Sequence, residues 1–143
     1  MSTNSSITIK TENGKFRTIY CHFDGYLAGV GKTLVEHYST QEKAEALLAG
    51  GDISFLEASC DKPEGHSFEK PVEGYTVYYG RDRGETDSGA RTYSSFSEVI
   101  KKEKQEFNYF LDGGLWVYFT RNNTHLCPVE NQQTENTYSK ALE

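Results

Sequence analysis

Long apolar runs, a basic leader and paired cysteines are all missing from this sequence. No segment approaches the ~18 apolar residues that a membrane-spanning helix needs. Residues 1–6 lack both the basic and the apolar stretch of a secretory signal. Cys21, Cys60 and Cys127 are odd in number and far apart, which predicts three free thiols. We therefore expect a cytoplasmic protein that folds under reducing conditions, with no membrane segment.

Positive charge is scarce. The chain has 15 Lys and Arg against 21 Asp and Glu, a formal net charge of −6. Because a nucleic-acid groove neutralises many phosphates with basic side chains, this balance argues against direct nucleic-acid binding.

The spacing typical of metal ligands is missing too. The histidines and cysteines show neither Cys-x-x-Cys nor His-x₃-His spacing, and His125 with Cys127 forms only an isolated pair. We expect no metal site and no cofactor.

The residues that are present predict one domain with a single core. A chain of 143 residues can bury a sizeable core, and ten Tyr and eight Phe supply much of its apolar area. Asn-Gly and Gly-Gly turns between alternating or aromatic runs predict two β-hairpins. The expected hairpin strands are residues 7–10 with 16–23, and 106–111 with 115–119.

Three short helices and further strands are expected between the hairpins. Capping-box patterns begin at Ser39 and Ser95, and apolar residues spaced four apart precede the first of them. The expected helices are residues 28–38, 39–49 and 95–104. The remaining segments are expected to be strands at 75–79 and 90–93, a turn or single helical turn at 52–56, a surface loop at 57–73 and an exposed loop at 80–89.

These elements predict an α+β fold. We expect a largely antiparallel sheet built from the two hairpins plus one or two strands, with about three short helices mostly on one face. One domain is expected over residues 1–121, followed by a polar tail over 122–143. The predicted core is Ile7, Ile9, Ile19, Cys21, Phe23, Leu34, Tyr38, Leu47, Leu48, Val77, Val99, Ile100, Leu111 and Val117.

Residues 19–38 nearly match a phosphate-binding loop. A Walker A loop needs Gly, four residues, then Gly-Lys-Ser/Thr, so that backbone N–H groups wrap a phosphate. Lys32 follows Gly31 as the motif requires, but five residues separate Gly31 from Gly25. The extra residue breaks the cradle, so we expect a solvated Lys32 and no P-loop chemistry.

No catalytic group stands out. Cys21 and His22 are neighbours on a strand, so their side chains point to opposite faces and cannot form a nucleophile–base pair. Cys60 lies on a polar loop where nothing suggests a lowered pKa. His22 and Asp24 share a strand face and could orient one another, although such pairs are more often structural. Enzymatic activity stays open, with no catalytic residue assigned.

The loop after the 75–79 strand is the most charged exposed element. Its candidates for recognition are Arg81, Asp82, Arg83 and Glu85. The arginine forks could receive a phosphate or carboxylate bidentately. Alternatively, the arginines pair with the two acids and neutralise the loop. A loop that projects from a buried strand is a common place for recognition, so it ranks first.

Aromatic side chains suggest a second recognition element. Because buried Tyr and Trp need polar partners, we expect some of them to form an aromatic surface on one sheet face. With a net charge of −6, such a surface favours a protein partner over stacked bases. The residues concerned are Tyr75, Tyr78, Tyr79, Tyr109, Trp116 and Tyr118.

Three strings of the sequence carry a family resemblance. They are Tyr-Cys-His-Phe-Asp-Gly-Tyr at residues 20–26, Gly-Val-Gly-Lys-Thr-Leu-Val-Glu-His-Tyr at 29–38, and Tyr-Gly-Arg-Asp-Arg-Gly-Glu at 79–85. With them the chain resembles, over roughly its first hundred residues, a family of small uncharacterised proteins encoded by bacteriophages and prophages. That family commonly has Trp at the position of Phe23. The resemblance implies a phage accessory protein located in the cytoplasm of the bacterial host, and it brings no established activity.

Three functions are compatible with these observations. The first is a protein that binds a host protein or complex and inhibits a bacterial defence system, in an anti-CRISPR or similar role. The second is a binder of, or enzyme for, a nucleotide-like small molecule held between the residue 22–32 turn and the arginine loop. The third is an assembly role through homo-oligomerisation. Besides the four loop residues, the candidate binding residues are His22, Asp24, Tyr26 and Lys32.

Overall fold

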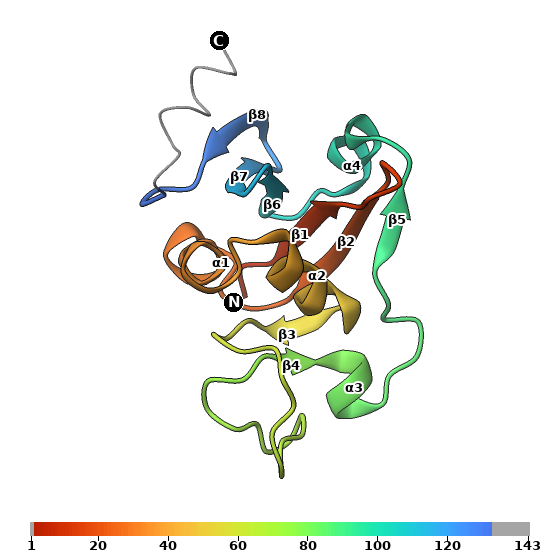
Figure 1. The fold of residues 1–143 in the computed structure, drawn as a ribbon, viewed down its shortest axis with the longest axis vertical. Coiled ribbons are helices and arrows are strands. Elements are labelled where there is room, and N and C mark those ends of the chain that lie inside the picture. Colours follow the sequence, from red (N-terminus) through yellow and green to blue (C-terminus); the bar gives the residue numbers. More distant parts are fainter. Residues whose placement is uncertain (1, 133–143) are drawn as a thin grey trace.

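The computed structural model describes residues 2–132 of the chain (Figure 1). These residues form one mixed β-sheet with helices packed on it. The strand order is β4-β3-β2-β1-β6-β7-β8, and β5 pairs with β2 beside this path. The strands are β1 (Ser5–Lys10), β2 (Phe16–Cys21), β3 (Ile53–Phe55), β4 (Val77–Tyr78), β5 (Arg91–Tyr93), β6 (Phe107–Asp112), β7 (Leu115–Thr120) and β8 (Asn123–Pro128).

The α+β class and both hairpins are confirmed, but the expectation of a largely antiparallel sheet is wrong. β1 pairs with β2 and β6 with β7 across the two predicted turns. The hairpins then join through a parallel β1–β6 pair, and β2 pairs in parallel with β3. Turn chemistry specifies pairing within a hairpin, whereas the join between hairpins depends on which faces must be buried together.

Helices cover both faces of the sheet: the two expected helices of the first half of the chain pack on one face, and the last expected helix packs on the other. They are the π-helix η1 (Leu27–Gly31) and the α-helices α1 (Lys32–His37), α2 (Gln41–Ala49), α3 (Tyr79–Arg83) and α4 (Phe96–Lys102). α1 and α2 bury Leu34, Leu47 and Leu48 against one face, with Ile7 and Ile19 (Figure 1). A second cluster packs α4 on the other face through Phe16, Val99, Phe110, Val117 and Phe119. Successive residues of a strand point to opposite faces, so β6 contributes Leu111 to the first cluster and Phe110 to the second.

The helix caps follow the predicted chemistry with one shift. Ser95 caps α4 by accepting a hydrogen bond from the Glu98 N–H, as expected. α2 is capped by Thr40, which accepts from the Lys43 N–H, and not by Ser39. The Ser39 hydroxyl instead donates to the Val35 carbonyl, 2.6 Å away.

The aromatic residues do not form the expected sheet surface. Tyr78, Tyr109 and Trp116 are fully buried, because each finds a backbone carbonyl as its polar partner. Tyr78 donates to Leu47 at 2.6 Å, Tyr109 to Gly25 at 2.7 Å and Trp116 to Tyr38 at 3.1 Å. The predicted core is confirmed except at Phe23, which is 43% exposed, and Ile100, which is half-buried.

Several segment boundaries differ from expectation. Residues 53–55 form β3 instead of a turn, because the backbone pairs with β2 and β4. β8 pairs with β7, so the expected boundary at residue 121 falls between two paired strands. The rest of the expected tail, residues 133–143, lies outside the described residues. Within residues 2–132, no helix has the length and apolar character that crossing a bilayer requires.

Candidate functional site: the corner of residues 22–32

The chain turns from β2 into α1 through a backbone with two uncommon features. Asp24 has φ 58°, a left-handed conformation that few non-glycine residues adopt. The next residues form η1, a π-helix, which is a rare conformation found frequently at functional sites. Such conformations persist only where the surroundings enforce them. This corner is therefore our candidate site.

Hydrogen bonds from three directions hold the corner. The Phe23 N–H donates to the Ser54 carbonyl of β3, and the Gly25 N–H donates to the Thr3 carbonyl, which precedes β1. The Tyr109 hydroxyl of β6 donates to the Gly25 carbonyl. The corner is thus fixed to the sheet.

Gly29 is required by close packing inside the corner. A Cβ atom there would lie 2.3 Å from the Asp24 carbonyl oxygen, which is backbone and cannot rotate away. Gly29→Ala is therefore expected to lower the free energy of unfolding by about 1–3 kcal/mol. Urea denaturation measures this change, and Gly89→Ala is the control because nothing lies within 4 Å of a Cβ at that position. Equal effects of the two substitutions would contradict the assignment.

The corner exposes a small aromatic surface, which we call the corner patch: His22, Phe23 and Tyr26. Phe23 is 43% and Tyr26 is 44% exposed, and they are the only exposed large hydrophobic side chains among the described residues. The His22 ring meets Phe23 edge-on, with ring centroids 4.5 Å apart. This contact orients the His22 and Phe23 rings relative to one another, and the Tyr26 hydroxyl is held by Asp24.

The polar side chains of the corner form hydrogen bonds with other side chains of the protein. His22 Nδ1 lies 2.7 Å from the Tyr20 hydroxyl, and its Nε2 lies 3.4 Å from the Ser2 hydroxyl. Asp24 accepts from the Tyr26 hydroxyl at 3.2 Å, which raises the pKa of Tyr26. The considered His22–Asp24 pair is therefore replaced by three separate contacts, two of His22 and one of Asp24.

A groove adjoins the patch, and we call it the corner groove. It has a volume of about 420 Å³ and runs between η1 with α1 on one side and the segment after β8 on the other. Its apolar lining comes from Leu27, Ala28, Val35 and Val129. Its charged side chains are Lys32, Glu36 and Glu130. Lys32 is solvent-exposed, as expected, and faces this groove rather than a phosphate cradle.

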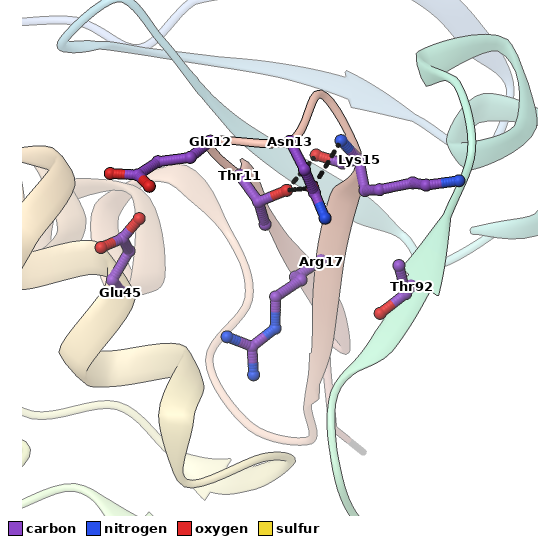
Figure 2. Close-up of a pocket in the computed structure, with 7 residues that line it drawn as sticks. All are labelled: Thr11, Glu12, Asn13, Lys15, Arg17, Glu45 and Thr92. Atoms are coloured by element: carbon purple, nitrogen blue, oxygen red, sulfur yellow. Dashed lines mark hydrogen bonds between the residues drawn. The ribbon is translucent and has the colours of Figure 1, made fainter.

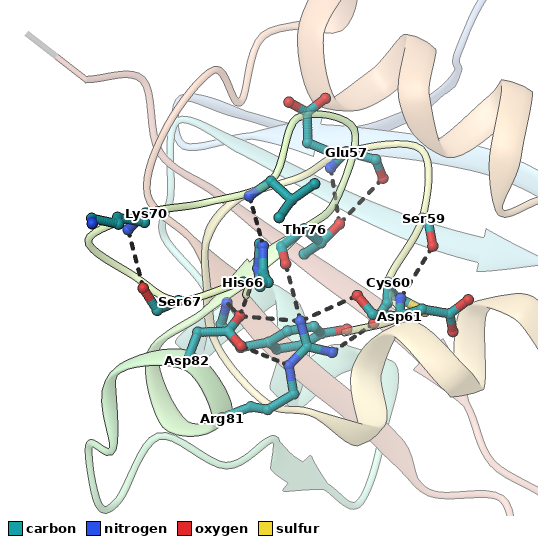
Figure 3. Close-up of polar contacts among 12 residues, drawn as sticks. Glu57, Ser59, Cys60, Asp61, His66, Ser67, Lys70, Thr76, Arg81 and Asp82 are labelled. Atoms are coloured by element: carbon teal, nitrogen blue, oxygen red, sulfur yellow. Dashed lines mark hydrogen bonds and ion pairs between the residues drawn. The ribbon is translucent and has the colours of Figure 1, made fainter. Parts of the chain in front are cut away.

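The arginine loop forms α3, with Asp82 buried at the centre of a network (Figure 3). Arg81 Nε donates to Asp82 Oδ1 at 2.8 Å, and Arg81 Nη1 donates to the Cys60 carbonyl at 2.8 Å. Arg81 Nη2 contacts Asp82 and the Thr76 carbonyl. All three guanidinium nitrogens are therefore engaged within the protein.

His66 completes this network from the loop between β3 and β4. Its Nδ1 accepts the Val72 N–H at 2.9 Å, so the ring proton is on Nε2. Nε2 lies 3.3 Å from Asp82 Oδ2, in contact with the carboxylate but outside hydrogen-bond geometry. Both imidazole nitrogens face protein groups, which leaves neither available to a substrate. The network therefore fastens the loop to the sheet edge.

The pKa of Asp82 gives a pH-dependent prediction. Burial alone would raise this pKa, but hydrogen bonds from Arg81 and the Tyr78 N–H outweigh it and lower the pKa. A carboxyl group whose pKa is lower in the folded than in the unfolded state stabilises the folded state at pH values above its unfolded-state pKa. This stabilisation is lost as the pH falls through the folded-state pKa. The difference in free energy of unfolding between the wild type and Asp82→Asn should be largest near neutral pH and shrink towards ~pH 3. Urea titrations across this range test it, and a pH-independent difference would contradict it.

Arg83 and Glu85 pair with each other at the surface. Their closest atoms are 3.4 Å apart, and the Arg83 guanidinium lies over the Phe68 ring. This arrangement matches the self-neutralised alternative. Within residues 2–132, no hydrogen bond or ion pair of Arg81, Asp82, Arg83 or Glu85 reaches the corner.

Another hollow opens beside the β1–β2 turn (Figure 2). It has a volume of about 580 Å³, and the Arg17 guanidinium lies between Glu45 of α2 and Thr92 of β5. Its charged side chains, Glu12, Lys15, Arg17 and Glu45, are two of each sign. The hollow is shallow and has no apolar floor, so it favours no particular ligand.

Arg91 joins two carboxylates where β2, β5 and the end of α4 meet. It contacts Glu103 at 3.0 Å and Asp52 at 3.3 Å. Burial would lower the pKa of Arg91, but the hydrogen bond to Glu103 outweighs burial and raises this pKa. Burial also raises the pKa of Asp52. We assign this cluster a structural role, because each of its charged groups contacts a group of opposite charge inside the fold.

Two of the thiols, Cys21 and Cys60, are unsuited to nucleophilic chemistry. Cys21 is buried, which raises its pKa to about 12. Burial and the neighbouring Asp61 raise the pKa of Cys60. All three cysteines are free, as predicted. In the described part of the chain, no group of three His, Cys, Asp or Glu side chains is placed to hold a metal.

Comparison of this chain with protein-family models, curated proteins and solved structures finds no match.

The structure adds residues that the sequence did not reveal as site residues. The alternation of β2 predicted Phe23 in the core, yet β2 ends at Cys21 and the Phe23 side chain beyond it is exposed. Val129 reaches the corner groove from the opposite end of the chain, and no local pattern signals that contact. His22 and Tyr26 were the two residues of the corner patch that the sequence analysis had named as candidates.

Proposed function

We propose that this chain is a binding protein whose interface is the corner patch with the corner groove. The supporting observation is that Phe23 and Tyr26, the two exposed large hydrophobic side chains of residues 2–132, both belong to one corner that hydrogen bonds fix to the sheet. Aromatic side chains on a preorganised surface provide large contact area with little loss of conformational freedom, as binding hot spots do. The net charge of −6 favours a protein partner over a nucleic acid.

The proposed partner is a host bacterial protein or complex. This part of the proposal comes from the sequence resemblance to phage and prophage proteins, which stays a prediction. An accessory phage protein that binds host machinery would act inside the bacterial cell, and we propose a defence system such as CRISPR as its target. No catalytic centre is part of the proposal, because the buried His66 and Cys21 side chains are both engaged within the fold.

The alternative of a nucleotide-like ligand has less support. It needs Arg81 and Arg83 to converge with His22, Asp24 and Lys32 around one pocket. Arg81 donates from all its guanidinium nitrogens to protein acceptors, and Arg83 pairs with Glu85. An anion would have to break these contacts before it could bind.

A capture experiment tests the proposal. The full chain is immobilised and incubated with bacterial lysate, and recovered proteins are identified by mass spectrometry. We expect a specific partner that the double variant Phe23→Ser, Tyr26→Ser no longer retains. The control is Glu12→Ser, Glu42→Ser, which changes two exposed residues far from the corner in the sequence. Recovery of no partner, or equal recovery by the corner variant, would contradict the proposal.

An infection assay tests the biological role. Expression of the chain in a bacterium with an active CRISPR defence should raise the plating efficiency of a targeted phage. The Phe23→Ser, Tyr26→Ser variant should lose this effect while the control variant keeps it. If plating is unchanged by the wild-type chain, the role against that defence system is wrong, although binding to another partner can still be measured.

A further inference from the structure

The corner groove has the features of a site for one apolar side chain of a partner polypeptide. Its volume of about 420 Å³ falls in the range of pockets that enclose small ligands or large side chains. Leu27 and Val35 pack against the main core while also lining the groove, so its floor is fixed. Val129 is buried on the other side and hydrogen-bonded through its N–H to the Trp116 carbonyl. An apolar group that enters the groove would therefore meet a preformed surface.

The charges around the groove restrict what can flank that apolar group. Glu36 stands on the α1 wall and Glu130 on the opposite wall, and both side chains are exposed. Lys32 is the single basic residue of the lining. Its carboxylates therefore exceed its ammonium groups by one, within a chain of net charge −6. A segment lying along the groove passes a carboxylate on each side, which favours Lys or Arg next to the apolar group.

We infer that the corner groove binds a partner segment consisting of an aromatic or large aliphatic side chain flanked by basic residues. This inference rests on the proposed binding function and names the chemistry of the partner. The corner patch supplies the adjoining contact surface, because Tyr26 directly precedes Leu27 of the groove.

Peptide selection tests this specificity. A random library of twelve-residue peptides displayed on phage is selected against the purified full chain, and selected peptides are synthesised with a fluorescent label. We expect an aromatic or Leu residue beside Lys or Arg in the selected peptides. Selection of acidic peptides, or of none above background, would overturn the inference.

Two charge-reversal variants test whether the basic residues of the peptide contact the groove walls. Glu36→Lys, Glu130→Lys changes the groove walls, whereas Glu64→Lys, Glu69→Lys changes two exposed carboxylates on the β3–β4 loop and alters the net charge equally. By fluorescence anisotropy, the first variant should bind the selected peptides about tenfold more weakly, and the second should differ less than about threefold. Equal weakening would assign the effect to overall charge and refute a local site.

Ala28→Trp places a large ring at an exposed position of the groove lining and should abolish peptide binding without touching the core. Unchanged binding would refute the location. A concentration-dependent mass in light scattering that Glu36→Lys, Glu130→Lys removes would instead assign the groove to a second copy of the chain, which overturns the inference.

Failure of this inference can be separated from failure of the proposed function. If a lysate partner depends on Phe23 and Tyr26 but not on Glu36 and Glu130, the binding function stands and the groove specificity is wrong. If the partner is independent of Phe23 and Tyr26, the proposed interface itself is wrong.

Discussion

Asp82→Ala is expected to lower the free energy of unfolding by about 3–5 kcal/mol, the range for removing one partner of a buried charge pair. The Asp82 carboxylate is buried and accepts hydrogen bonds from Arg81 and the Tyr78 N–H. Its removal leaves the Arg81 guanidinium without its counter-charge and the His66 Nε2 proton facing an empty space. The side chain therefore contributes far more than a surface acid (Figure 3).

Urea denaturation measures this change, with Glu85→Ala as the matched control. Glu85 also pairs with an arginine, but its side chain is 43% exposed, so its removal should change stability by less than ~1 kcal/mol. The loop between β3 and β4 should also become more sensitive to proteolysis in Asp82→Ala. A loss below about 1 kcal/mol would show that the network contributes little and that the loop is held by other contacts.

Trp116→Ala is expected to lower the free energy of unfolding by about 3–5 kcal/mol, the range for truncating a large buried aromatic residue. Trp116 has no exposed surface and belongs to the main core beneath α1 and α2. Its indole N–H donates to the Tyr38 carbonyl at the end of α1, so the substitution also leaves that carbonyl unpartnered.

Two further variants serve as comparisons for Trp116→Ala. Trp116→Phe keeps most of the ring volume and should show a clearly smaller loss than Trp116→Ala, because part of the cavity is filled. Phe23→Ala removes an exposed aromatic residue and should stay within ~0.5 kcal/mol of the wild type. A large loss in Phe23→Ala would mean that Phe23 supports the fold instead of serving the proposed interface.

Local sequence patterns predicted the elements whose signals are local. The Asn13-Gly14 and Gly113-Gly114 turns specified both hairpins, and Ser95 marked the start of α4. β3 was missed because three residues are too few to show alternation, and its pairing partners come from distant parts of the chain. The burial of Tyr78, Tyr109 and Trp116 was missed because their partners are carbonyls 31, 84 and 78 residues away.

Local patterns likewise predicted some features of the candidate site and missed others. The unusual glycine-rich corner was visible in the sequence, and the extra residue between Gly25 and Gly31 correctly predicted an exposed Lys32. The outward direction of Phe23 and the contribution of Val129 were not visible. The first depends on where β2 ends, at Cys21, and the second on how β8 and the following segment return to β7.

The sequence by itself determined the α+β class, the hairpins, most of the core and the three free thiols, because these follow from residue type, periodicity and turn chemistry within short windows. Only the tertiary structure decided the parallel β1–β6 join, the enclosure of Asp82 with His66, and the meeting of η1 with residues 129–131 at the corner groove. These features depend on contacts between residues far apart in the chain. Their free energy comes from burial and from polar groups finding partners, which no local pattern encodes.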